Sequence, residues 1–578
     1  MTFLFRLGVL EFLQQETSRL NRKLLLLTAA SGTANALILA VINAAVESIG
    51  KQSQGPGWRH FLIFTFALGL FVYSLRYIMY ESTGIAEEAV RSVRDRLADK
   101  IRRVNLAALE SIGEADIHAR ISRETSAIGQ AARPLFSAAQ SAVMVAFTML
   151  YIATVSPVAA LLCAAMIVGG IGVYLKDRET IAEGLQQASC CEDDLFISLT
   201  GLLKGFKELR INRLKSDDVF EEFGNATAKV RDVRTRVMMQ LSDGIVFVEA
   251  FFLVLVGSIV FVLPLLSPSF SGSIVKVVAA VLFLIGPLTN VVMMFPVLSQ
   301  VDVTVGNLRR LEAKLDGLLS GSASGEEEQI DRLDQFSEIR LSGVRFTYHA
   351  PDGSASFHLG PADAIIRRRE LLFLVGGNGS GKTTFMKLIT ALYLPEQGSV
   401  AVDDVLVTPR NVQSYRNLFS AIFSDFHLFD KLYGLRDVDP ARVDRLLELM
   451  EISSKISYRD GRFSDIKLST GQRKRLALVV AYLEDKPVYV FDEVAADQDP
   501  QFRNYFYEVM LPDLKKAGKT VVAVSHDDRF FHVADRVLRM EYGRLEELTE
   551  TAKPARKRAG SGAGKRSNKG GVAYETIS

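Results

Sequence analysis

Long apolar stretches occupy much of the first half of the chain. Each is long enough to cross a bilayer as a helix, which takes about 20 residues. The six stretches cover residues 24–46, 61–80, 137–155, 158–175, 245–266 and 274–298. Only Ser156-Pro157 separates the third from the fourth, which predicts a tight turn. The pattern therefore predicts a membrane domain of six transmembrane helices.

The polar loops between these stretches differ sharply in charge. The outer loops carry only Lys51, Arg59 and Lys276. The two long loops are basic and contain Arg91, Arg94, Arg96, Lys100, Arg102 and Arg103 in the first, and Lys176, Arg178, Lys204, Lys207, Arg210, Arg213 and Lys215 in the second. Because basic loops remain in the cytoplasm, we expect both termini and both long loops there. Glu11 and Glu16 interrupt the first apolar run, so no cleavable signal peptide is predicted.

Helical periodicity continues through both long loops, so the second to fifth spans should extend beyond the membrane. Residues 111–121, with Gly113, interrupt the first loop and predict a short helix across the end of a longer pair. Residues 202–210 look similar. We interpret both turns as docking surfaces for a soluble domain, the alternative being solvated connectors.

The second half of the chain changes to short apolar strands that alternate with helices. Strands are expected at 339–348, 371–375, 488–491 and 521–524, and a helix at 382–392. This order predicts an α/β domain with a nucleotide loop. We expect a membrane domain at 1–319, a linker at 320–330, the α/β domain at 331–548 and a disordered basic tail at 549–578. The tail's Arg556-Lys557-Arg558 is either solvated or touches anionic lipid.

Composition agrees with a membrane part joined to a soluble part. Of 578 residues, 48% are hydrophobic and 23% charged. The net charge of +2 argues against a nucleic-acid partner. Cys163, Cys190 and Cys191 suit neither a disulfide framework nor a metal site, so free thiols are expected.

A glycine-rich segment follows the strand at 371–375 and opens the helix after it. This context suits a phosphate loop, whose backbone N–H groups and helix N-terminus surround phosphates. We expect it to bind ATP through Gly376, Asn378, Gly379, Ser380, Gly381, Lys382, Thr383 and Thr384. Lys382 would reach the β- and γ-phosphates, and the Thr383 hydroxyl would ligate Mg²⁺.

Two carboxylates end the apolar strand at 488–491. Asp492 is expected near the metal, and Glu493 is positioned to polarise an attacking water. A strand-capping acidic pair is the alternative. His526 follows the strand at 521–524 and a serine.

The segment Leu468-Ser-Thr-Gly-Gln472 precedes a helical run and forms a second anion site through Ser469, Gly471 and Gln472. It resembles the signature of ATP-binding cassette (ABC) proteins, and His526 is similar to their switch histidine. Six spans followed by one cassette resemble an ABC half-transporter of the exporter type. The resemblance covers the whole chain.

This resemblance implies several further roles. Two chains pair, with each ATP held between the phosphate loop of one cassette and the signature of the other. Tyr348 matches the aromatic residue that stacks on adenine, and Asp499 matches the interface aspartate. All elements of the ATP site occur in this one chain, so a homodimer is expected, with a heterodimer left open.

Three departures from the family pattern are informative. Thr470 replaces a glycine, Ser424 replaces a glutamine that reports on Mg²⁺, with Asp425 as another candidate for that role, and Asp497-Gln498-Asp499 replaces the usual stretch. These variants resemble the subgroup that exports cyclic peptides and peptide siderophores.

The resemblance implies ATP-driven export by alternating access across a bacterial inner membrane. Alternatives are a lipid or drug exporter, a siderophore importer and an ATP-gated channel or regulator. Asn43, Glu249 and Asn290 are candidates for the cavity within the spans.

Overall fold

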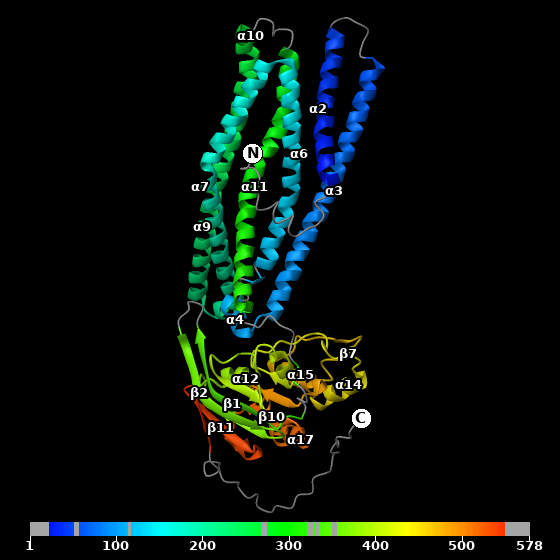
Figure 1. Cartoon of the computed structure of the whole chain (residues 1–578). Coiled ribbons are helices and arrows are strands. Elements are labelled where there is room, and N and C mark those ends of the chain that lie inside the picture. Colours follow the sequence, from blue (N-terminus) through cyan, green and yellow to red (C-terminus); the bar gives the residue numbers. More distant parts are fainter. Residues whose placement is uncertain are drawn as a thin grey trace, which may run out of the picture. The chain divides into compact units, whose positions relative to one another are not determined.

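The computed structural model divides the chain into two compact units, one comprising Met1–Arg102 with Glu114–Asp316 and the other Arg103–Gly113 with Gly317–Ser578 (Figure 1). The described residues are 22–50, 57–113, 117–118, 120–266, 274–320, 329–330, 335–349 and 355–548. Most of the expected linker and the whole expected tail lie outside them.

Long helices build the first unit and run side by side in Figure 1. They are α2 (Arg22–Gly50), α3 (Trp58–Arg103), α6 (Thr125–Val155), α7 (Pro157–Lys204), α9 (Arg213–Gly257) and α11 (Ile274–Ser320). Every apolar stretch lies in one of them, and the fifth continues from α9 through η2 (Ser258–Val262) into α10 (Leu263–Leu266). Among the described residues, five helices are long and apolar enough to cross a membrane, and α7 contributes the shorter apolar stretch Pro157–Gly170.

The expected tight turn joins α6 to α7. Ser156 ends α6 and caps α7, where its hydroxyl oxygen accepts a hydrogen bond from Ala159 N at 3.3 Å. Pro157 takes the first helical position, where its missing N–H costs nothing.

The polar candidates within the spans have different surroundings. Asn43 is only 5% exposed and donates to Tyr151 Oη at 3.1 Å and Lys276 O at 3.4 Å. Asn43 therefore ties helices together. Glu249 and Asn290 are exposed in the single chain, and Asn290 donates to Ser141 Oγ at 3.4 Å.

Two sheets form the core of the second unit. The parallel strands β11 (Arg536–Glu541), β3 (Leu371–Val375), β10 (Thr520–Val524), β9 (Val488–Phe491) and β6 (Phe419–Ile422) lie in that order, with β12 (Arg544–Glu547) antiparallel at the β11 edge. The antiparallel sheet has the order β2 (Ala355–Arg367), β1 (Glu338–His349), β4 (Gln397–Val402) and β5 (Val405–Leu406). A third pair comprises β7 (Tyr458–Arg459) and β8 (Arg462–Phe463).

Strand β3 shows why the sheet reads as continuous apolar runs in the sequence. All its residues are buried. Phe373 faces one hydrophobic core, with the helices around α15 (Thr470–Glu484), while Leu372 and Leu374 face the other, with α12 (Lys382–Ile389) and the antiparallel sheet. A strand covered on both faces needs apolar side chains at every position.

Shorter helices complete this unit. They are α13 (Val412–Arg416), α14 (Pro440–Leu449), α16 (Pro500–Tyr505), η5 (Phe506–Met510), α17 (Leu511–Lys516) and η6 (Asp528–Val533). The helix expected at 382–392 ends at Ile389, and Ala391 adopts the left-handed conformation with φ 51°.

The short helix expected at 111–121 lies partly outside the described residues, and residues 117–118 within it are helical. The structure has α4 (Leu106–Ile112) before Gly113, whose φ of +89° ends it, and the π-turn η1 (Arg120–Glu124) after it. Helix α4 belongs to the same unit as the sheets, and Leu106 packs on one of its cores. The second predicted turn corresponds to α8 (Phe206–Ile211) in the helical unit.

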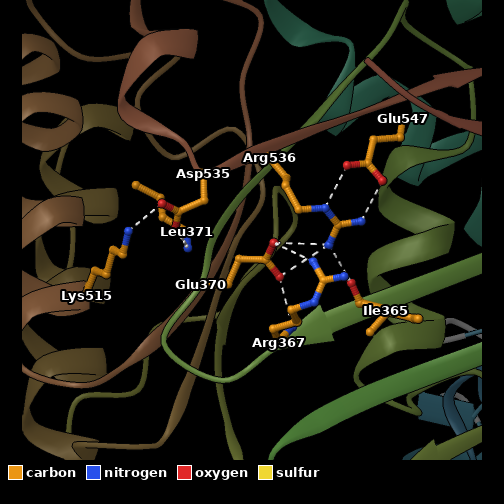
Figure 2. Close-up of polar contacts among 8 residues, drawn as sticks. All are labelled: Ile365, Arg367, Glu370, Leu371, Lys515, Asp535, Arg536 and Glu547. Carbon is orange, nitrogen blue, oxygen red and sulfur yellow. Dashed lines mark hydrogen bonds and ion pairs between the residues drawn. The ribbon is translucent and has the colours of Figure 1, made fainter. Parts of the chain in front are cut away.

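An ion-pair network joins the amino ends of β3 and β11, opposite the glycine-rich loop (Figure 2). Arg536 Nη1 donates to Glu370 Oε1 at 3.1 Å, and its Nε and Nη2 bind the Glu547 carboxylate at 2.8 Å each. Leu371 N donates to Asp535, which also pairs with Lys515. The network therefore holds β3 and β11 together at their amino ends, away from the glycine-rich loop.

Candidate nucleotide site

The glycine-rich loop runs from β3 into α12. Gly376, Gly379 and Gly381 have φ values of 151°, 77° and 105°, which glycine adopts readily. A Cβ at Gly376 would come within 2.2 Å of Met540 O, and one at Gly381 within 2.8 Å of the Phe357 ring. These positions therefore require glycine. Asn378 lies exposed on the loop, and Thr384 is partly buried in the first turn of α12.

Lys382 turns its ammonium back over this loop. Nζ donates to Gly377 O at 2.9 Å and Gly376 O at 3.1 Å, and the residue is only 5% exposed. Burial lowers the pKa of Lys382, while Glu493 and Asp492 oppose that shift. A phosphate at the loop would give this buried cation an anionic partner in place of two neutral carbonyls.

Asp492 is half-satisfied at the end of β9. Its Oδ2 accepts the Thr383 hydroxyl at 2.9 Å. Burial raises the pKa of Asp492 and Glu493 raises it further, while Thr383 and Ser424 lower it. Within the described chain, Asp492 Oδ1 and Ser380 Oγ are buried without a hydrogen bond of normal geometry. Two unpartnered oxygens beside a hydroxyl and a lysine fit a Mg²⁺ ion with phosphate oxygens.

Glu493 and His526 meet across the ends of β9 and β10. His526 Nε2 lies 2.7 Å from Glu493 Oε1, and both side chains are partly exposed. They line a cavity of about 290 Å³ together with Arg503, Tyr507 and Asp527. Glu493 has φ 51°, a left-handed conformation that is uncommon outside glycine. Glu493 and His526, which the sequence singled out separately, thus lie together beside open space.

The signature segment forms the start of α15. Ser469 caps the helix, and its Oγ accepts from Gln472 N at 3.4 Å while Gln472 Oε1 accepts from Ser469 N at 3.1 Å. A Cβ at Gly471 would lie 3.0 Å from Asp497 O. The departure Thr470 is the first residue of the helix.

The two candidates for the missing glutamine lie in different surroundings. Ser424 acts on Asp492, whose pKa it lowers. Asp425 is exposed and instead raises the pKa of Tyr393, alongside burial and Glu110. Both residues are exposed, and of the two it is Ser424 that acts on the Asp492 carboxylate.

The remaining two candidates lie elsewhere on this unit. Tyr348, near the end of β1, is 40% exposed. Asp499 caps α16, accepting from Gln501 N and Phe502 N at 3.0 Å each. These bonds and Arg475 lower the pKa of Asp499.

Comparisons with known proteins agree with this arrangement. Residues 359–496 match the ABC transporter family model. The chain is 30% identical over 530 residues to the ATP-binding protein SyrD of Pseudomonas syringae pv. syringae, covering 89% of this chain and 91% of the relative. The chain belongs to the ABC transporter family. It is therefore a half-transporter, in which ATP hydrolysis drives transport across a membrane.

Other relatives match a smaller share. The mycobactin import ATP-binding/permease protein IrtB of Mycolicibacterium thermoresistibile is 30% identical over 264 residues, 43% of each chain. An ATP-dependent lipid A-core flippase of Ralstonia nicotianae is 29% identical over 295 residues, 48% of this chain and 47% of the relative. A solved bacterial Atm1-family ABC exporter with ATP bound has the same fold, with a TM-score of 0.72 at 18% identity over 90% of this chain and 93% of that one.

Sequence reasoning missed a polar anchor that holds α4 in this unit of the transporter. Glu110 accepts hydrogen bonds from Lys387 Nζ at 3.1 Å and from Tyr393 Oη at 2.5 Å. Phe346 stacks on Tyr393 with ring centroids 4.6 Å apart. Burial and Glu110 raise the pKa of Tyr393. No motif marks these residues, so only their meeting in three dimensions identifies them.

Proposed function

We propose that two copies of this chain export a cyclic peptide or peptide siderophore across the bacterial inner membrane. The observation that carries the cargo proposal is the combination of Thr470, Ser424 and Asp497-Gln498-Asp499 with the end-to-end relationship to SyrD. The basic loops favour cytoplasmic termini and a cytoplasmic cassette.

In this proposal the loop from Gly376 to Thr384 holds the ATP phosphates and Tyr348 stacks on the adenine. Thr383 and Asp492, with Ser424, would hold Mg²⁺, which would offset phosphate charge. Glu493 accepts a proton from the attacking water, and His526 orients this carboxylate and reaches the γ-phosphate. Ser469, Gly471 and Gln472 complete the site on the partner's ATP, next to Asp499.

Pairing with a second copy is supported by apolar residues around α8. Phe206, Ile211 and Leu214 are 60%, 88% and 76% exposed in the single chain. Apolar clusters of this kind on a polar cytoplasmic segment mark interaction surfaces. A twofold pair is also the commonest symmetric assembly.

Alternating access follows from two ATPs bridging two cassettes. Moving an equilibrium from 1:99 to 99:1 requires about 5.5 kcal/mol of differential binding. Two nucleotides that contact both chains only in the closed state supply such differential binding free energy, and hydrolysis removes it.

Transport in oriented vesicles tests the cargo and the direction together. Inside-out vesicles containing the protein should accumulate a fluorescent cyclic peptide siderophore in the presence of ATP, and Glu493→Gln vesicles should not. Fluorescent phospholipid is the matched probe for a lipid exporter. Uptake of neither peptide nor siderophore, with translocation of lipid, would reject the cargo proposal.

Import is the second candidate, because one relative is described as a mycobactin importer. Right-side-out vesicles loaded internally with ATP distinguish it. Accumulation of siderophore in these vesicles and not in inside-out ones would reverse the proposed direction.

A further inference from the structure

Lys474 occupies an unusual position in the second turn of α15. Its side chain is only 6% exposed. Nζ donates to Glu493 O at 2.9 Å and to Asp497 Oδ2 at 2.6 Å. A single buried ammonium thus joins the signature helix to the main chain of Glu493 and to one of the departures from the family pattern.

A hydrogen bond to the Glu493 carbonyl acts directly on the main-chain conformation of that residue. With φ 51°, Glu493 has a conformation that persists only where its surroundings enforce it. Ala496 N also donates to Glu493 O at 3.2 Å, and His526 contacts the side chain at 2.7 Å. The main-chain torsions set the direction of the Glu493 Cα–Cβ bond, so whatever holds the carbonyl constrains where the carboxylate can lie.

Asp497 and the two residues after it complete the polar contacts around Lys474. Asp497 neutralises the buried ammonium, which would otherwise be costly. Gln498 Nε2 donates to Gly471 O at 2.9 Å and its Oε1 accepts from Arg475 at 2.9 Å. Arg475 also pairs with Asp499. All three residues of the departure therefore bind α15.

We propose that Lys474 is a positioning residue for ATP hydrolysis, acting through the main-chain carbonyl of Glu493. The proposal rests on the proposed role of Glu493 as the base. Lys474 need not touch nucleotide to act in this way. Its removal should slow the chemical step and leave ATP binding nearly unchanged.

The chain offers a closely matched control at the other end of α15. Asp485, which ends that helix, also has a left-handed φ, of 49°. Lys519 Nζ donates to Asp485 O at 3.1 Å and lies 2.7 Å from Asp485 Oδ1. Lys519, like Lys474, thus binds the carbonyl of a residue with a left-handed φ and a carboxylate, although here both oxygens belong to Asp485, which has no part in the site.

The test compares steady-state ATPase kinetics of the full-length protein in nanodiscs. Lys474→Met should lower kcat about 10-fold or more with KM for ATP within about twofold, the pattern of an interaction needed only in the transition state. Lys474→Arg should restore part of kcat. Lys519→Met should leave kcat within about twofold, whatever its effect on thermal unfolding.

A double-variant cycle separates positioning from general structural damage. If Lys474 acts through Glu493, Lys474→Met should cause no further loss of kcat in a Glu493→Gln background. Multiplied losses, an unchanged kcat in the single variant, or an equal loss in Lys519→Met would overturn the proposal. If Glu493→Gln itself leaves hydrolysis intact, the proposed function fails first, and the two failures are thereby distinguished.

Discussion

The two anion-binding ends of the cassette differ in how their polar groups are partnered. At the phosphate loop, Lys382 bonds its own loop carbonyls, and in the described part of the chain Asp492 Oδ1 is buried without a hydrogen bond of normal geometry. At the signature end, Ser469 and Gln472 satisfy each other, and Lys474 is paired with Asp497. One end is incomplete without a ligand, whereas the other is a rigid platform already satisfied within the chain.

One half of a nucleotide site can therefore keep buried polar groups that need a ligand, while the other half is fully hydrogen-bonded before the ligand arrives. Unsatisfied buried groups are costly, so ligand binding at the phosphate loop relieves a penalty already present in the fold. The signature platform has no such penalty to relieve, and its contribution comes from presenting a helix N-terminus in a fixed orientation.

The largest expected effect is on hydrolysis. Glu493→Gln should lower kcat by about 100-fold or more, because general-base catalysis is lost, while ATP binding persists. Phosphate release and equilibrium nucleotide binding measure the two properties separately. The exposed Glu508→Gln is the control. Retained hydrolysis in Glu493→Gln would remove this residue from the catalytic step.

Lys382→Ala should weaken ATP binding by about 10-fold or more, since a charge-assisted hydrogen bond to phosphate is lost. Isothermal titration of the detergent-solubilised protein measures the affinity. Lys516→Ala is the control, because Lys516 is exposed and pairs only locally with Asp513. Equal affinity in wild type and Lys382→Ala would contradict the assignment of this loop.

Asp492→Asn and Asp499→Ala should shift stability in opposite directions. The pKa of Asp492 is raised in the folded state, so folding favours its protonated form. The contribution of protonated Asp492 to folding stability is fully present below the unfolded pKa of about 3.9 and is lost as pH rises through the folded-state pKa. Without nucleotide, Asp492→Asn should therefore raise the melting temperature at pH 7.5, and the gain should shrink towards pH 4.

The lowered pKa of Asp499 gives the reverse sign, since its stability is present above the ordinary aspartate pKa and is lost as pH falls through the folded value. Asp499→Ala removes a helix cap and should cost about 1 kcal/mol at pH 7.5. Thermal unfolding across pH 4–8 measures both variants. Shifts of the same sign would show that the two ends do not differ as described.

The smallest effect is expected for Thr470→Gly, which restores the usual family residue. Glycine should weaken the first turn of α15 by about 0.5–1 kcal/mol, and kcat should change less than about threefold. Steady-state ATPase assays and thermal unfolding check this. A larger change in kcat would mean that the Thr470 side chain takes part in the signature site itself.

Much of this molecule could be predicted because its strongest signals are local. The strand at 371–375 was placed correctly because both its faces are buried, and Gly376 and Gly381 lie in a motif with fixed spacing. The order of motifs also singled out Glu493 and His526 separately, and the structure places them 2.7 Å apart.

The remaining features depend on contacts between distant residues. Lys474 looks like an ordinary surface lysine in the sequence, and its burial depends on Asp497, 23 residues later. The anchor at Glu110 depends on Lys387, 277 residues later. Ser424 and Asp425 are neighbours in the sequence, yet Ser424 acts on Asp492 and Asp425 on Tyr393. Helix α4 was not predicted, because Gly113 marks where a helix ends and says nothing of which side it lies on.

The strand order has a consequence for synthesis of the protein. Strand β3 lies between β10 and β11, and the carbonyl of Met540 in β11 lies so close to Gly376 that a Cβ there would come within 2.2 Å of it. A nascent chain therefore displays its glycine-rich loop on the ribosome long before the strands that wall it have been translated. The walls of the glycine-rich loop are therefore complete only once translation has passed β11.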